Sequence, residues 1–212
     1  MLTPDLPAHG RRADEAFTMA AAVGAIDVAV ESAAPGQPVV LAGHSLGGYV
    51  AMEYAARHPH ALTGLLTLGA AAIPRGLGAA AYGLLGWATE RAGREAITRL
   101  NDRMLTRIAP PEVVDPIRAE GYWFDGVRPS WSAVMAGGRP ELLREVDCPV
   151  LVVRGQWDQL GVDGPRYAAA APRGRLLTVR GASHLLPLTR PWQTSALIAA
   201  FAREVVRAGA SR

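Results

Sequence analysis

Short apolar runs, separated by longer stretches of helical periodicity, set the pattern of this chain. Four runs are apolar at nearly every position and are short, which is typical of strands that are buried on both faces. We expect these strands at residues 39–42, 62–68, 149–154 and 176–179. Helices are expected at residues 13–33, 47–58, 165–171 and 191–207. This alternation predicts an α/β fold, in which helices flank a mostly parallel sheet of about four strands.

The pattern changes between the second and third expected strands. Amphipathic stretches with scattered arginines occupy residues 82–89 and 94–108, and Pro110 and Pro111 suit the start of a further helix. These features predict a helical insertion rather than another strand. We therefore divide the chain into a first part of the core, the insertion and a second part of the core, at residues 1–69, 70–147 and 148–212.

Composition excludes several classes of function. Half of the residues are hydrophobic and the formal net charge is only +3, which fits a compact globular enzyme. All 22 residues counted as Lys or Arg are arginine, so the chain lacks the lysine that Schiff-base enzymes and P-loop nucleotide sites require. The arginines form no basic stripe, and we expect no nucleic-acid partner.

Cysteine usage and the apolar segments bear on the location of the protein. Cys148 is the only cysteine, which rules out an intrachain disulfide and a cysteine-rich metal site. Asp27 and Glu31 interrupt the alanine-rich segment near the start, so we expect no membrane span. The first residues show no secretory signal. These observations predict a cytoplasmic protein with no metal site.

The strongest chemical signal is the sequence Gly43-His44-Ser45-Leu46-Gly47. It has the form G-x-S-x-G, and it lies between an expected strand and an expected helix. A serine on such a tight strand-to-helix turn presents its hydroxyl above the sheet, because the glycines let strand and helix approach closely. The alternative is that Ser45 is an ordinary serine of a turn, with no catalytic role. The context favours Ser45 as a nucleophile.

An activated serine needs a base, and the base needs an acid to orient it. Asp158 follows the third expected strand and His184 follows the fourth, in the chain order acid then histidine that is typical after such a serine. Groups at the carboxyl ends of parallel strands collect at one edge of the sheet. Asp163 is an alternative acid in the same loop as Asp158. We expect His44 to pack beside the turn rather than to react.

Several segments together resemble the α/β-hydrolase superfamily over nearly the whole chain. They are the segment Gly43–Gly48 and the runs PVLVVRGQWD, GASHLLPLTRP and PDLPAHGRR. The resemblance implies Ser45 as nucleophile, His184 as general base and acid, and Asp158 as the orienting carboxylate. It also implies that the backbone N–H of Leu46 lies in the oxyanion hole, and that the helical insertion is a cap over the site.

The expected substrate is a small acyl compound, hydrolysed without a cofactor. Candidate substrate-binding residues are Trp87, Trp123, Trp131, Trp157 and Leu185. Residues 76–81 are similar to a dinucleotide fingerprint, which raises the alternative of a nucleotide-binding oxidoreductase. We discount that alternative because Pro74 and Arg75 separate the fingerprint from the strand before it, and no acidic residue follows at the expected distance.

The opening run PDLPAHGRR resembles the end of the family's fourth strand and the loop after it. The family's first three strands are therefore expected upstream, and we expect the true start of the protein to lie before Met1. Without those strands, residues 39–42 form an exposed apolar edge, which favours pairing with another chain. This predicts a homodimer through the edge strand. An alternative is a catalytically weak or inactive fragment that pairs there with a partner chain.

Overall fold

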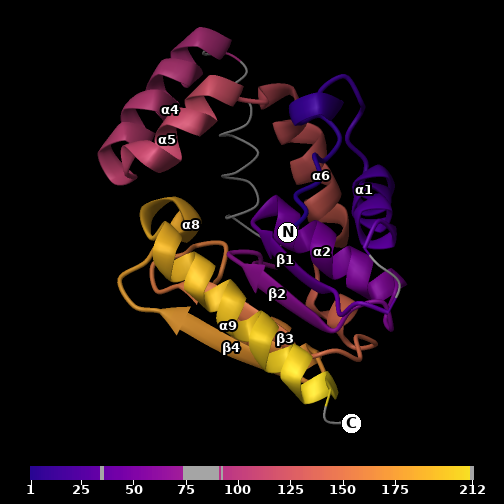
Figure 1. Cartoon of the computed structure of the whole chain (residues 1–212). Coiled ribbons are helices and arrows are strands. Elements are labelled where there is room, and N and C mark those ends of the chain that lie inside the picture. The colour runs from indigo at the N-terminus through magenta and orange to yellow at the C-terminus, as the bar shows by residue number, and fades with distance from the viewer. Residues whose placement is uncertain (34–35, 74–90, 92, 211–212) are drawn as a thin grey trace.

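The core of the molecule is a four-stranded parallel sheet (Figure 1). The computed structural model describes residues 1–33, 36–73, 91 and 93–210. The strands lie in chain order, as β1 (Val40–His44), β2 (Gly64–Leu68), β3 (Val150–Gly155) and β4 (Gly174–Val179). All three pairings are parallel, which confirms the predicted α/β fold and places each strand within a few residues of its expected range.

Helices precede, connect and follow the strands. The α-helices are α1 (Met19–Glu31), α2 (Leu46–Arg57), α4 (Arg94–Ile108), α5 (Pro111–Glu120), α6 (Val127–Gly137), α7 (Gly164–Ala170), α8 (Leu186–Thr189) and α9 (Pro191–Ala210). Short 3-10 helices are η1 (Gly10–Arg12), η2 (Phe124–Gly126) and η3 (Pro140–Leu143). None of the helices in the described ranges is both long enough and apolar enough to cross a membrane.

The first helix begins later than the sequence pattern predicts. The expected helix over residues 13–33 starts only at Met19, because Thr18 has an extended backbone and caps the helix. The hydroxyl of Thr18 accepts a hydrogen bond from the N–H of Ala21 at 3.1 Å. This satisfies one of the N–H groups that a helix start leaves unpaired, and it fixes the boundary there.

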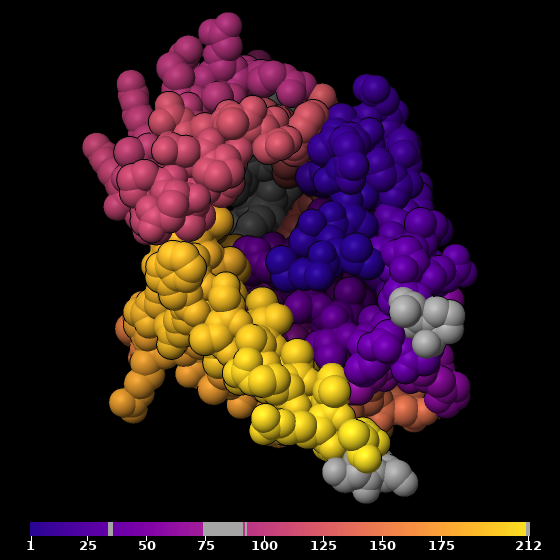
Figure 2. Space-filling model, viewed as in Figure 1, coloured from indigo at the N-terminus to yellow at the C-terminus, as the bar shows by residue number. Residues whose placement is uncertain are grey.

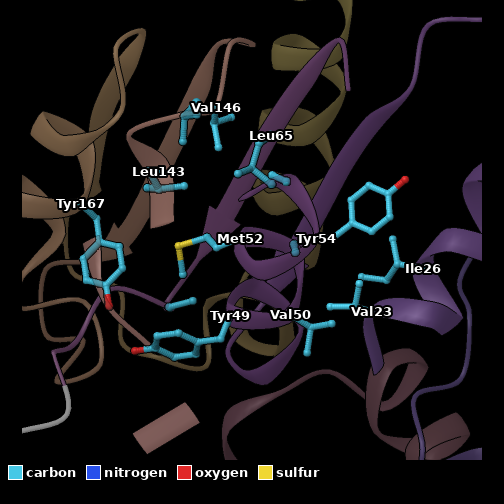
Figure 3. Close-up of a cluster of buried hydrophobic side chains, with 14 of the residues drawn as sticks. Val23, Ile26, Tyr49, Val50, Met52, Tyr54, Leu65, Leu143, Val146 and Tyr167 are labelled. Carbon is cyan, nitrogen blue, oxygen red and sulfur yellow. The ribbon is translucent and has the colours of Figure 1, made fainter. Parts of the chain in front are cut away.

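Two apolar clusters cover the two faces of the sheet. On one face, α2 packs against β1 and β2, and α7 packs against β3 and β4. α1 covers the outer side of α2, η3 lies against α2 and α7, and Leu65 belongs to the apolar cluster on this face (Figure 3). On the other face, Phe201 and Val205 of α9 pack against Leu66 and Leu68. Every residue of β2 is buried, as the continuous apolar run at its position predicts. The sheet is therefore a rigid base for the loops at its carboxyl edge.

The insertion between β2 and β3 is helical in its described part. Figure 1 shows α4 and α5 side by side and away from the sheet, whereas α6 lies against α1 and α2. The helix expected from Pro110 is found as α5, with Pro111 as its first residue. The expected amphipathic stretch at residues 82–89 lies outside the described residues. Figure 2 shows the surface hollowed between α4–α5 and the N-terminal residues.

β1 lies at one edge of the sheet and pairs only with β2 among the described strands. The carbonyl of Val39 accepts a hydrogen bond from the N–H of Thr63, and the N–H of Ser45 donates to the carbonyl of Leu68. The backbone groups of every second residue from Val39 to Ser45 therefore face β2. The backbone groups of Val40 and Ala42 point away from the sheet. The edge is thus apolar and partly open, as the sequence predicts, and its pairing with a second copy stays a prediction.

Candidate active site

Ser45 lies on a strained turn between β1 and α2. Its backbone angles are φ 51° and ψ −120°, in a region that residues with a side chain seldom adopt. Gly43 permits this turn, because a Cβ there would lie 2.2 Å from the carbonyl oxygen of Gly47. Gly48 is equally constrained, with Ala70 2.4 Å from the position of its missing Cβ. The turn has the form predicted from the G-x-S-x-G pattern.

Three side chains from three loops meet above the carboxyl edge of the sheet. The Oγ of Ser45 lies 3.0 Å from Nε2 of His184, and Nδ1 of His184 lies 3.1 Å from Oδ1 of Asp158. Ionised aspartate only accepts, so Nδ1 carries the hydrogen in this arrangement and Nε2 is left to accept from the serine hydroxyl. The contacts form one continuous hydrogen-bonded chain from the hydroxyl to the carboxylate.

The carboxylate end of this chain is shielded from water. The side chain of Asp158 is 1% exposed, whereas that of His184 is 16% exposed. The N–H of Leu160 donates to Oδ1 of Asp158 at 2.9 Å, which satisfies part of the charge that burial removes from water. Asp158 is therefore held in place by its own loop as well as by His184.

Gly69 makes room for the His184–Asp158 pair. It directly follows β2, and its backbone has a φ of 56°. A Cβ at this position would lie 2.8 Å from Nδ1 of His184 and 2.9 Å from Oδ2 of Asp158. A side chain here would displace the pair. Sequence reasoning missed this residue, although a glycine directly after a buried strand was a usable signal.

The two candidate acids have different surroundings. Asp158 contacts His184, whereas a carboxylate oxygen of Asp163 accepts a hydrogen bond from the N–H of Ile73 at 2.9 Å. Asp163 also forms an ion pair with the exposed Arg166 at 3.6 Å. The structure thus brings Asp158, and not Asp163, into the hydrogen-bonded chain.

His44 supports the loop that carries His184. Its Nε2–H donates to the backbone carbonyl of His184 at 2.9 Å, and the centroids of the two rings lie 4.9 Å apart. Burial lowers the pKa of His44 below its ordinary value of 6.5, because the charged form loses its hydration. His44 therefore packs beside the turn, as predicted from the sequence.

The lowered pKa of His44 predicts an acid-sensitive fold. In the unfolded chain His44 takes up a proton near pH 6.5, whereas in the folded protein it does so only at a lower pH. The neutral, buried His44 therefore contributes to the stability of the fold above pH 6.5, and this contribution is lost as the pH falls below that value. Each unit of lowered pKa corresponds to about 1.4 kcal/mol. We expect the melting temperature of the wild type to fall more between pH 7 and pH 5 than that of His44→Gln. Equal losses in thermal melts of the two proteins would contradict this assignment.

The other residues predicted for the site are spread around it. Leu46 is the first residue of α2, directly after Ser45, which puts its backbone N–H at the start of the helix. Leu185 is half-buried and follows His184 directly. Trp131 packs against the main apolar cluster, so part of its role is in the core.

The remaining tryptophans are more exposed. The exposed fraction is 69% for Trp157 and 36% for Trp123. Trp87 lies outside the described residues. A role in substrate binding stays a prediction for each of the five candidates. No group of three side chains suited to a metal ion occurs within the described parts of the chain.

Comparison with known proteins identifies the family. The family model described as "Alpha/beta hydrolase family" matches residues 1–196. A stretch of 35 residues is 57% identical to chloroplastic pheophytinase from Arabidopsis thaliana and covers 16% of this chain, but it spans only 7% of that protein's length.

Two solved structures show the same fold. An esterase from Thermogutta terrifontis has a TM-score of 0.69 and 24% identity, covering 97% of this chain and 75% of that one. MenH from S. aureus has a TM-score of 0.70 and 18% identity, covering 95% and 82%. At these identities the likeness is one of fold.

Proposed function

Because the chain belongs to the alpha/beta hydrolase family, we propose that it is a serine hydrolase that cleaves an ester or a related acyl compound through an acyl-enzyme. The observation that carries the proposal is the continuous hydrogen-bonded chain from Ser45 through His184 to Asp158. Ser45 at a turn with the form of a nucleophile elbow supports it further. This chemistry requires neither a metal nor an organic cofactor.

The first half of the reaction forms the acyl-enzyme. The Oγ of Ser45 attacks the carbonyl carbon of the substrate while its proton passes to Nε2 of His184. The N–H of Leu46 stabilises the negative oxygen of the tetrahedral intermediate. The intermediate then collapses, His184 delivers the proton to the leaving alcohol, and the acyl group stays on Ser45.

The second half uses water in place of the serine. His184 takes a proton from the water, the hydroxyl attacks the acyl carbon, and the proton returns to Oγ of Ser45 as the acid leaves. Asp158 accepts a hydrogen bond from Nδ1 throughout, so it keeps the ring oriented and stabilises the imidazolium in both halves. In this proposal the acyl group contacts Trp123, Trp131, Trp157 and Leu185, and the further candidate Trp87 lies outside the described residues.

Labelling with a fluorophosphonate tests the proposal directly. The probe reacts with activated serines, so we expect one probe per chain, located by peptide mass spectrometry on the peptide that contains Ser45. Hydrolysis of p-nitrophenyl esters with acyl chains of increasing length then measures the acyl preference. A folded protein that takes up no probe and hydrolyses none of the esters would refute the assignment.

The open edge of β1 favours a second candidate function, that of a weak or inactive hydrolase which pairs with another chain. Mass measurement by light scattering after gel filtration, combined with labelling, separates the two candidates. A labelled protein in any oligomeric state supports the hydrolase. An unlabelled folded dimer supports the second candidate.

A further inference from the structure

The segment that leaves β2 for the helical cap is held by an unusual concentration of polar contacts. It comprises residues 70–73. Three side chains, Tyr49, Asp163 and Tyr167, bond its backbone, and we call these three residues the anchor. They come from α2, from the loop after β3 and from α7. The hydrogen-bonded chain described above uses none of them.

The two tyrosines bond the same residue. The hydroxyl of Tyr49 accepts from the N–H of Ala72 at 3.0 Å and donates to its carbonyl at 2.9 Å. The hydroxyl of Tyr167 donates to that carbonyl at 3.4 Å. Tyr49 is 2% exposed and Tyr167 is fully buried, and Figure 3 shows both hydroxyls pointing to the same place. Burial raises the pKa of Tyr167, so its hydroxyl stays a donor.

Asp163 joins the same segment to the loop that carries Asp158. Its carboxylate accepts from Ile73 and its N–H donates to the carbonyl of Ala71 at 2.9 Å. The N–H of Ala71 in turn donates to the carbonyl of Leu160 at 2.8 Å. Leu160 is the residue whose N–H bonds the carboxylate of Asp158. Residues 70–73 are therefore tied to the Asp158 loop at two points, Leu160 and Asp163, of which Leu160 also bonds the carboxylate of Asp158.

Gly69 transmits any movement of this segment to the site. It precedes residues 70–73 directly, and it has no clearance for a Cβ beneath His184 and Asp158. A displacement of residues 70–73 would therefore be expected to move Gly69 toward the pair or to shift the Asp158 loop. An error of about 1 Å in a reacting group lowers turnover by about a hundredfold.

We propose that Tyr49, Asp163 and Tyr167 are positioning residues for hydrolysis, which fix the start of the cap so that Asp158 and His184 stay aligned with Ser45. The proposal rests on the proposed function. None of the three residues touches the reacting atoms. They act through the backbone of residues 70–73, through Gly69 and through the Asp158 loop.

Paired variants of Asp163 test this proposal. Asp163→Ala removes the acceptor for the N–H of Ile73, and we expect kcat on p-nitrophenyl esters to fall by about ten- to a hundredfold, with KM changed less than about twofold. Asp163→Asn retains an amide oxygen that accepts the same hydrogen bond, and it should keep kcat within about threefold of the wild type. Arg166→Ala, which removes only the exposed partner of Asp163, is the control and should match the wild type.

Tyr49→Phe provides a second measurement if Asp163→Ala does not fold. It keeps the buried ring and removes both bonds to Ala72, so it should slow fluorophosphonate labelling of Ser45 by about tenfold while circular dichroism stays that of the wild type. Wild-type rates in folded Asp163→Ala or in Tyr49→Phe would overturn the proposal, as would equal losses in Asp163→Ala and Asp163→Asn. Absence of labelling in the wild type itself would instead count against the proposed hydrolase.

Discussion

Alanine in place of Ser45 is expected to abolish fluorophosphonate labelling and to lower kcat on p-nitrophenyl esters by about a millionfold. The substitution removes the only atom proposed to form a bond to the substrate, and it leaves His184 without a hydroxyl to accept from. The backbone strain at φ 51° is common to serine and alanine, so the fold should not change. Steady-state kinetics, labelling and circular dichroism on the same preparation measure all three quantities.

The matched control is Ser132→Ala, which alters an exposed serine of α6. This variant should take up the fluorophosphonate probe, and hydrolyse p-nitrophenyl esters, at the same rates as the wild type. Esterase activity that persists in purified Ser45→Ala would show that another residue, or a contaminant, carries the reaction.

The second large effect is expected at Asp158. In Asp158→Asn the side chain keeps its size but loses the negative charge that is proposed to orient His184 and to stabilise its imidazolium. A change of this kind in a serine protease lowers kcat by about ten-thousandfold, and we expect a loss of the same order here. Because the N–H of Leu160 and Nδ1 of His184 both face Oδ1 of Asp158, we expect the amide oxygen to keep that place, and the loss then comes from the missing negative charge.

Asp163→Asn is the matched variant for this measurement, since it makes the same chemical change five residues further along the loop. Its bond to Ile73 survives the change, so kcat should stay close to that of the wild type. A larger loss in Asp163→Asn than in Asp158→Asn would reverse the roles given to the two acids.

The sheet and the proximity of its chemical groups were predictable from local patterns. Buried parallel strands are continuously apolar, so all four strands are visible in the sequence, and Ser45, Asp158 and His184 each follow one of them. Parallel strands bring such residues to one edge whatever their separation in the chain. The start of α1 was wrong by several residues because the hydrogen bond of Thr18, rather than the apolar pattern, sets it.

The parts that sequence reasoning missed depend on tertiary contacts. Gly69 matters because two side chains from distant loops lie over it, and Tyr49 matters because its hydroxyl reaches the backbone of Ala72. The spacing of residues along the chain does not predict these tertiary contacts. The resemblance favoured Asp158 over Asp163, and the hydrogen bond to His184 is the tertiary contact that separates the two acids.

The order of the strands also bears on how the proposed active site assembles. β2 and β3 are neighbours in the sheet, although residues 69–149 separate them in the chain. Ser45 therefore belongs to one half of the sheet, and Asp158 and His184 to the other. Closing so long a connection costs entropy before strand pairing compensates, so we expect the two halves to join after the local helices have formed. On that order of events, a newly made chain would gain the proposed hydrogen-bonded chain at Ser45 only when the two halves of the sheet pair.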